Sequence, residues 1–273
     1  VALDGQHIVS GSGDKTIKVW DRETGALVHT LTGHEGSVYS VALDGQHIVS
    51  GSMDNTIKVW DRETGALVHT LTGHEGFVYS VALDGQHIVS GSGDNTIKVW
   101  DRETGALVHT LTGHEGDVYS VALDGQHIVS GSEDETIKVW DRETGALVHT
   151  LTGHEGEVYS VALDGQHIVS GSWDKTIKVW DLETGALVHT LTGHEDAVTS
   201  VALDGQHIVS GSGDKTIKVW DLETGALVHT LTGHEGNVYS VALDGQHIVS
   251  GSEDKTIKVW RRPAFDLASV GSI

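Results

Sequence analysis

The chain has 273 residues, of which 38% are hydrophobic, with 35 Gly, one Pro and no Cys. The lack of Cys excludes disulfides, thiolate metal sites and Cys nucleophiles, and it fits a reducing compartment, so we expect a cytoplasmic protein. The formal net charge is −22, and the longest basic run is Arg261-Arg262. So acidic a chain repels nucleic acid and anionic membranes, and no apolar run approaches the about 18 residues of a membrane helix. We therefore expect no nucleic acid and no membrane among its partners.

The sequence VALDGQHIVSGS recurs with a constant period of 40 residues and no insertion. Its copies begin at residues 1, 41, 81, 121, 161, 201 and 241. A fixed period of this length is typical of repeat architectures, in which each unit is one supersecondary structure. We therefore predict a single domain over residues 1–273, in which residues 261–273 are a degenerate C-terminal strand and tail.

Each copy predicts four short strands separated by tight turns. Runs of β-branched and apolar residues alternate with Gly, Asp-Gly or Thr-Gly signals, which is typical of antiparallel hairpins. No segment keeps a helical period over a useful length. In the second copy the expected strands are residues 38–43, 47–50, 56–60 and 66–71, and the expected turns are 44–45, 51–55 and 63–65.

Four-stranded units in tandem either close into a ring or stack in a line. A ring hides the faces of its sheets, whereas a linear stack needs terminal repeats with polar outer faces. The first copy has no such cap, which favours the ring. We therefore predict an all-β fold, a seven-bladed β-propeller of four-stranded antiparallel blades.

Two dipeptides recur in register along the chain. Gly33-His34 is followed by Trp60-Asp61, and the pair returns as Gly73-His74 with Trp100-Asp101 and onward. This pattern resembles the WD40 repeat, and the resemblance covers residues 1–260. It implies a WD40-type propeller that serves as a non-catalytic scaffold for a protein or peptide. Because the copies are almost identical, the array is either recently amplified or engineered, and the sequence leaves both open.

A set of Ser, His and Asp recurs in six copies and invites a catalytic interpretation. An active site needs one preorganised cleft rather than a copy in every blade, and no nucleophile elbow is present, so we expect no catalytic residue and no enzyme. The resemblance implies instead a structural chain of hydrogen bonds, whose hydroxyl is that of Ser50 or, as the less favoured alternative, Ser52. The expected tetrads are His34, Ser50, Asp54, Trp60; His74, Ser90, Asp94, Trp100; His114, Ser130, Asp134, Trp140; His154, Ser170, Asp174, Trp180; His194, Ser210, Asp214, Trp220; and His234, Ser250, Asp254, Trp260.

The first and last copies depart from this pattern. The first holds Ser10, Asp14 and Trp20 but lacks the His of the tetrad. The last ends in the tail 261–273, where Leu267 takes the place of the first Leu of the fourth strand. We therefore expect the seam between the first and last blades to be the weakest in the ring.

The chain contains 19 His, which could suggest a metal site. The repeat explains all of them, because they fall in the three columns of His7, His29 and His34. The segment 11–16 has the composition of a phosphate-binding loop, but the Gly before Lys-Thr is missing and a strand follows. We therefore expect no metal and no cofactor.

A few columns vary among the otherwise invariant copies, and nearly all of them lie in two loops. These loops enter the first strand and join the second strand to the third, so they emerge at one end of an antiparallel blade. The turns at the other end do not vary, which favours recognition over random drift. In WD40 proteins the corresponding face usually binds the partner. The candidate partner-binding residues are Ser37, Tyr39, Met53, Phe77, Tyr79, Asp117, Tyr119, Glu133, Glu135, Glu157, Tyr159, Trp173, Tyr239 and Glu253.

Aromatic side chains with carboxylates nearby suit a cationic peptide, through charge and cation–π contacts. We therefore hypothesise that blades 2 to 5 bind a basic, partly apolar protein segment, and that the protein is a monomer. The alternative is a structural or self-assembling repeat module without a dedicated ligand, natural or engineered. In that case blade exchange between near-identical copies gives oligomers.

Overall fold

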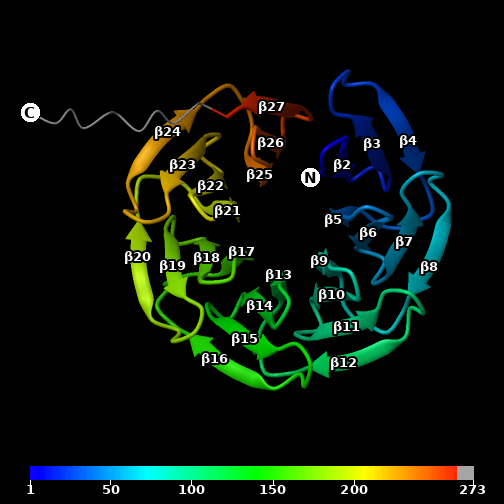
Figure 1. Ribbon diagram of the computed structural model, residues 1–273, viewed down its shortest axis with the longest axis horizontal. Coiled ribbons are helices and arrows are strands. Elements are labelled where there is room, and N and C mark those ends of the chain that lie inside the picture. Colours follow the sequence, from blue (N-terminus) through cyan, green and yellow to red (C-terminus); the bar gives the residue numbers. More distant parts are fainter. Residues whose placement is uncertain (263–273) are drawn as a thin grey trace, which may run out of the picture.

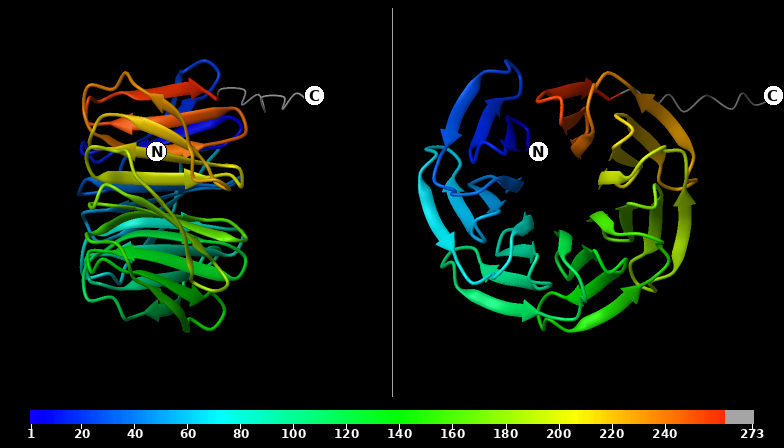
Figure 2. Two further views of the ribbon diagram at one scale, coloured as in Figure 1. Left: turned by 90° about the vertical axis from the view of Figure 1, so that its left-hand side faces the viewer. Right: turned by 180° about the vertical axis from the view of Figure 1, so that it is seen from behind.

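Residues 1–262, the part that the computed structural model describes, contain strands and turns but no helix. The strands form seven antiparallel sheets around a central axis, like the blades of a propeller (Figure 1). Seen edge-on, the strands run across the thickness of the disc between its two faces (Figure 2). The predicted all-β, seven-bladed propeller is confirmed.

Within each blade the strands follow one another from the axis to the rim (Figure 1). The innermost strands are β1 (Ala2–Leu3), β5 (Val38–Leu43), β9 (Val78–Leu83), β13 (Val118–Leu123), β17 (Val158–Leu163), β21 (Val198–Leu203) and β25 (Val238–Leu243). The second strands are β2 (His7–Gly11), β6 (His47–Ser52), β10 (His87–Ser92), β14 (His127–Ser132), β18 (His167–Ser172), β22 (His207–Ser212) and β26 (His247–Ser252). The third strands are β3 (Ile17–Asp21), β7 (Ile57–Asp61), β11 (Ile97–Asp101), β15 (Ile137–Asp141), β19 (Ile177–Asp181), β23 (Ile217–Asp221) and β27 (Ile257–Arg261). The fourth strands are β4 (Leu27–Leu31), β8 (Leu67–Leu71), β12 (Leu107–Leu111), β16 (Leu147–Leu151), β20 (Leu187–Leu191) and β24 (Leu227–Leu231).

The second strand is longer than the sequence predicts, because the innermost strand contains a β-bulge. In blade 2, β6 continues to Ser52, which pairs with Val38. The next pair joins Ser40 to Gly51, so Tyr39 has no partner of its own. The same shift recurs in blades 3 to 7. A bulge re-aims the side chain of the extra residue, here the tyrosine of a variable column.

The hydrophobic core lies between neighbouring blades. Alternating apolar residues cover both faces of each sheet, so each blade depends on its neighbours for burial. The close approach requires glycine at Gly51, where a Cβ would lie 2.7 Å from Val78 Cγ1. Between blades 2 and 3 the core cluster is Val49, Ile57, Val59, Leu71, Val78, Val81, Ile88 and Trp100.

Polar contacts also join the blades, and they recur at equivalent positions. Between blades 2 and 3 the amide of Val81 donates to Ser40 Oγ at 3.1 Å, and Arg102 forms an ion pair with Asp44. At the seam between blades 7 and 1 the equivalent contacts are present. The amino group of Val1 donates to the Ser240 hydroxyl at 2.8 Å, and Arg22 pairs with Asp244. That this seam is the weakest stays a prediction.

The ion pairs between blades are interrupted at two positions where Leu replaces Arg. Leu182 and Leu222 are buried and join the apolar clusters between blades 4 and 5 and between blades 5 and 6. Arg262, in the segment 261–273 that the sequence predicts as a degenerate strand and tail, occupies the usual arginine position and pairs with Asp204. Arg261 ends β27. The rest of the predicted C-terminal strand, with Leu267, lies outside the described residues.

Candidate functional site

The structure brings the members of each expected tetrad together, with closely similar geometry in blades 2 to 7. In blade 4, His114 Nδ1 donates to the Asp134 carboxylate at 2.7 Å, and its Nε2 accepts from the Ser130 hydroxyl at 2.8 Å. The Trp140 indole N–H donates to the same hydroxyl at 3.0 Å. The hydroxyl of Ser132 has another role, since it accepts from the Asp134 amide at 3.1 Å.

The Asp of each tetrad fastens the two variable loops to each other. In blade 2 the Asp54 carboxylate accepts from the His34 ring, from the Glu35 amide at 2.8 Å and from the Thr56 hydroxyl at 2.6 Å. Burial acts to raise the pKa of Asp54, but the bonds from Thr56, Glu35 and His34 outweigh it and lower the pKa to about 2. Blade 1 has only part of this network, in which the indole of Trp20 donates to Ser10 at 3.1 Å.

These carboxylates are expected to make the protein sensitive to acid. The pKa of each tetrad Asp is lowered in the fold, so its contribution to stability is present above its ordinary pKa of 3.8 and is lost as the pH falls further. Burial also lowers the pKa of His34, so protonation at acidic pH adds to the loss. The melting temperature, followed by circular dichroism, should fall steeply between about pH 4 and pH 2. A melting temperature that is constant over this range would contradict the prediction. In the Asp54→Asn variant, the melting temperature should depend less steeply on pH.

The two variable loops lie side by side in every complete blade. The amide of Met53 donates to the carbonyl of Ser37 at 2.9 Å, and that of Trp173 donates to the carbonyl of Glu157 at 2.9 Å. The corresponding bonds join Gly93 to Phe77, Glu133 to Asp117, Gly213 to Ala197 and Glu253 to Asn237. Nearly all of the columns that vary along the chain therefore lie on one face of the disc, which we call the variable face.

Four tyrosines form a ladder across the inner part of the variable face. The ring centroids of Tyr39 and Tyr79 are 5.5 Å apart, those of Tyr79 and Tyr119 are 5.2 Å apart, and those of Tyr119 and Tyr159 are 5.4 Å apart. Such spacings are typical of interacting aromatic pairs. Each of these tyrosines is the extra residue of a β-bulge, so the same change in side-chain direction is repeated in successive blades.

Two further aromatic residues extend this ladder at its sides. The ring centroids of Phe77 and Tyr79 are 6.2 Å apart, and those of Trp173 and Tyr159 are 6.3 Å apart. The Trp173 side chain is 59% exposed, whereas the tetrad tryptophans of blades 2 to 6 are buried. We call Tyr39, Phe77, Tyr79, Tyr119, Tyr159 and Trp173 the aromatic crescent.

Carboxylates surround the aromatic crescent. Burial and the charge of Asp117 raise the pKa of Tyr79 to about 12. Burial together with Glu157 and Glu133 also raises the pKa of Tyr119. Tyr79 and Tyr119 therefore stay neutral at neutral pH and lie close to several carboxylates. Glu133 and Glu135 are exposed at the same turn of blade 4.

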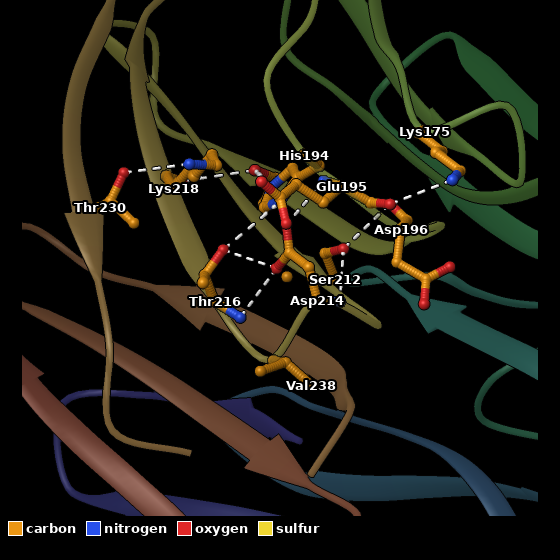
Figure 3. Close-up of polar contacts among 12 residues, drawn as sticks. Lys175, His194, Glu195, Asp196, Ser212, Asp214, Thr216, Lys218, Thr230 and Val238 are labelled. Atoms are coloured by element: carbon orange, nitrogen blue, oxygen red, sulfur yellow. Dashed lines mark hydrogen bonds and ion pairs between the residues drawn. The ribbon is translucent and has the colours of Figure 1, made fainter. Parts of the chain in front are cut away.

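The crescent ends at blade 6. Thr199 stands in the tyrosine column, and its hydroxyl donates to the carbonyls of Gly211 and Val238, which ties blade 6 to blade 7. Asp196 replaces a glycine, and its carbonyl accepts from Ser212 Oγ at 3.0 Å (Figure 3). The structure therefore leaves Tyr239 of blade 7, an expected site residue, outside the crescent. Glu253 shares that blade.

One feature of the variable face was missed by sequence reasoning. The residue after the turn Asp has a positive φ in all seven blades, between 64° and 70°. Left-handed backbone is unfavourable for non-glycine residues, so Gly would be the least strained choice. The occurrence of Asn in two copies was the available signal. These residues are Lys15, Asn55, Asn95, Glu135, Lys175, Lys215 and Lys255.

Among residues 1–262, no group of three or more His, Asp or Glu side chains is placed to hold a metal ion. The same residues include no helix long and apolar enough to span a bilayer.

Blades of four antiparallel strands, tied by a His–Ser–Asp–Trp network, define a β-propeller of the WD-repeat class. The family model described as "WD domain, G-beta repeat" matches residues 1–21, 25–61, 65–101, 105–141, 145–181, 185–221 and 225–261, so the chain belongs to the WD40 family. WD40 propellers are generally non-catalytic scaffolds that commonly bind other proteins.

Relatives match single repeats of the chain. WD repeat-containing protein pop1 of Schizosaccharomyces pombe is 54% identical over 41 residues, which are 15% of this chain and 5% of that protein. Topless-related protein 4 of Arabidopsis thaliana is 59% identical over 34 residues, which are 12% of this chain and 3% of that protein. The chain thus corresponds to a small part of these relatives.

A solved structure resembles almost the whole chain. The crystal structure of the computationally designed Ika8 protein is similar with a TM-score of 0.81 and 39% identity. The similarity covers 95% of this chain and 82% of that one.

Proposed function

We propose that this propeller is a non-catalytic scaffold, formed by one domain over residues 1–273, that binds a protein or peptide on its variable face. The observation that carries the proposal is the aromatic crescent, in which Tyr39, Phe77 and Trp173 are exposed and the other three rings are half-buried, with carboxylates beside them. Exposed aromatic anchors dominate binding energy at protein interfaces, and nearby negative charge favours cationic partners. The partner is therefore a basic, partly apolar protein segment, and the protein is a cytoplasmic monomer.

The strained backbone of the variable turns supports a recognition role. A side chain kept at positive φ in each blade costs stability compared with Gly. Such positions are retained where the side chain serves a purpose, and Lys15, Glu135 and Lys215 are exposed at this position. In contrast, we assign the tetrads a structural role, because both ring nitrogens of each His are already bonded and the Ser hydroxyl is fully buried.

Peptide binding tests the proposal directly. A short fluorescein-labelled peptide of alternating Lys and Leu is titrated with the protein and followed by fluorescence anisotropy. Saturable binding is expected, and it should weaken as NaCl is added because surface charges are screened. The Trp173→Ala and Phe77→Ala double variant should weaken binding by about tenfold or more. A peptide of alternating Glu and Leu should not bind.

A charge-matched pair of variants separates the variable face from general acidity. Glu133→Gln with Glu157→Gln removes two charges beside the crescent, whereas Glu63→Gln with Glu103→Gln removes two from the exposed turns at the other end of the blades. The first variant should weaken binding and the second should not. Equal effects, or no preference for the cationic peptide, would contradict the proposal.

The alternative function is a structural or self-assembling repeat module. The near-identical seams and the similarity to a computationally designed propeller favour it. In that case light scattering after size exclusion should give a mass above one chain that grows with concentration, and Trp173→Ala should leave peptide binding unchanged.

A further inference from the structure

Every blade has an Asp-Gly turn between its first and second strands, and these turns share closely similar hydrogen bonds. In blade 4 the Asp124 Oδ1 accepts from the amides of Gln126 and His127, at 2.7 Å each. Gly125 is exposed, and among residues 1–262 its amide donates no hydrogen bond. The seven turns are Asp4-Gly5, Asp44-Gly45, Asp84-Gly85, Asp124-Gly125, Asp164-Gly165, Asp204-Gly205 and Asp244-Gly245.

The second carboxylate oxygen divides these turns into two groups. In five of them it forms an ion pair with an arginine of a neighbouring blade. The pairs are Asp4 with Arg62, Asp44 with Arg102, Asp84 with Arg142, Asp204 with Arg262 and Asp244 with Arg22. The arginine that would reach Asp124 is replaced by Leu182, and the one that would reach Asp164 is replaced by Leu222.

The remaining charged contacts of these two aspartates are weak. Within residues 1–262 the only ion-pair contacts of Asp124 and Asp164 are with the histidines three residues later, at 3.5 Å and 3.4 Å. Residues 263–273 contain no Lys, Arg or His, so they hold no substitute for the missing arginines. Two of the seven turns therefore lack a cationic clamp on the carboxylate.

The two groups of turns are otherwise alike. The main-chain amide at the variable position donates to a glutamine carbonyl in both groups, at 2.8 Å from Leu182 and at 2.9 Å from Arg102. The side chains of Asp124 and Asp44 are each 25% exposed. The groups thus differ in the arginine and not in the access of water to the turn.

We propose that Asp124-Gly125 and Asp164-Gly165 are sites of spontaneous isoaspartate formation, and that arginine protects the other five turns. In this reaction the Gly125 nitrogen attacks Cγ of the protonated Asp124 carboxyl group and loses its proton, while the carboxyl hydroxyl leaves as water. A water molecule then opens the succinimide ring at the main-chain carbonyl of Asp124. The chain now continues through Cγ, the α-carboxylate is free, and the mass is unchanged.

The arginine opposes the first step in two ways. It favours the charged form of the carboxyl group, which is a poor electrophile, and it holds one oxygen in a charge-assisted hydrogen bond. Rotation of the side chain toward the glycine nitrogen breaks this bond at Asp44. At Asp124 the same rotation breaks only the bonds from two main-chain amides. Glycine as the following residue adds no side chain that would block the attack.

Ageing of the full chain at neutral pH and physiological temperature tests the proposal. Trypsin releases each turn in a different peptide, because the variable residues distinguish the copies. Residues 103–138 contain Asp124, 143–175 contain Asp164, and 23–58 contain Asp44. Electron-transfer fragmentation identifies isoaspartate in each peptide. It should accumulate at Asp124 and Asp164 about tenfold faster than at Asp44, or more, because a hydrogen bond to a charged group opposes the reaction only at Asp44.

Exchange of the variable residue gives matched controls in both directions. Leu182→Arg should slow isoaspartate formation at Asp124 and leave Asp164 unchanged, whereas Arg102→Leu should accelerate it at Asp44. The melting temperatures of the fresh variants, measured by circular dichroism, show that the fold is kept. Equal rates in all the turns, or an unchanged rate at Asp124 in the Leu182→Arg variant, would overturn the proposal.

Isoaspartate formation also has an expected effect on stability. It moves the carboxylate that now accepts from the Gln126 and His127 amides, and it lengthens the main chain between β13 and β14 by one carbon atom. The melting temperature of the aged chain should therefore fall, and it should fall less in the Leu182→Arg and Leu222→Arg double variant. Trp173→Ala should change neither result, so the test is independent of peptide binding at the variable face.

Discussion

Replacement of Trp140 by Ala should lower the free energy of unfolding by about 3–5 kcal/mol, as is typical of large-to-small substitutions of buried aromatic residues. The indole is 2% exposed and belongs to the cluster between blades 3 and 4. Its N–H also satisfies the Ser130 hydroxyl. The substitution therefore leaves a cavity between two blades and removes one hydrogen bond of the tetrad. Urea unfolding followed by circular dichroism measures the loss.

Trp173 supplies the control for this substitution. It is the same residue type one blade further on, but its side chain lies on the variable face and is 59% exposed. Trp173→Ala should change the free energy of unfolding by less than about 0.5 kcal/mol. If both substitutions destabilise the protein equally, the assignment of Trp140 to the core and Trp173 to a binding surface is wrong.

Ser130→Ala is expected to have the next largest effect, although it removes a single oxygen. The hydroxyl binds both His114 and Trp140, and both partners are buried. Each buried polar group that is left without a partner costs about 1–3 kcal/mol. Two groups lose their partner in this variant, so the free energy of unfolding should fall by more than the loss of one ordinary hydrogen bond.

The first blade offers a matched comparison, because its serine has a smaller network. Ser10 accepts from Trp20 at 3.1 Å, and Trp20 is partly exposed, so water can replace the lost bond. Ser10→Ala should therefore cost clearly less than Ser130→Ala in the same urea titration. Equal costs would mean that the histidine contact adds nothing to the stability of a blade.

The fold could be predicted from the sequence because the repeat fixes both the strand pattern and the number of blades. The 40-residue period leaves room for four strands and their turns, and the recurring dipeptides set their order. The prediction missed the length of the second strand, since a bulge at Tyr39 depends on how two strands pair and not on local composition.

Contacts between blades were beyond sequence reasoning for the same reason. Arg102 and Asp44 are 58 residues apart, and no local pattern marks them as partners, although the Arg column is Leu in two copies. The variable columns, in contrast, were visible because internal copies could be compared, and their place on one face follows from antiparallel pairing.

The repeated seam has a consequence for the evolution of blade number. Most seams within the array use the same kinds of contact, such as Val81 with Ser40 and Arg102 with Asp44. Deletion or duplication of one 40-residue unit at the DNA level would join two existing surfaces and create no new one. The residues in contact at a seam therefore do not determine the number of blades. The count is selected only by the angle at which the last blade meets the first, so copy number can change in a single recombination event.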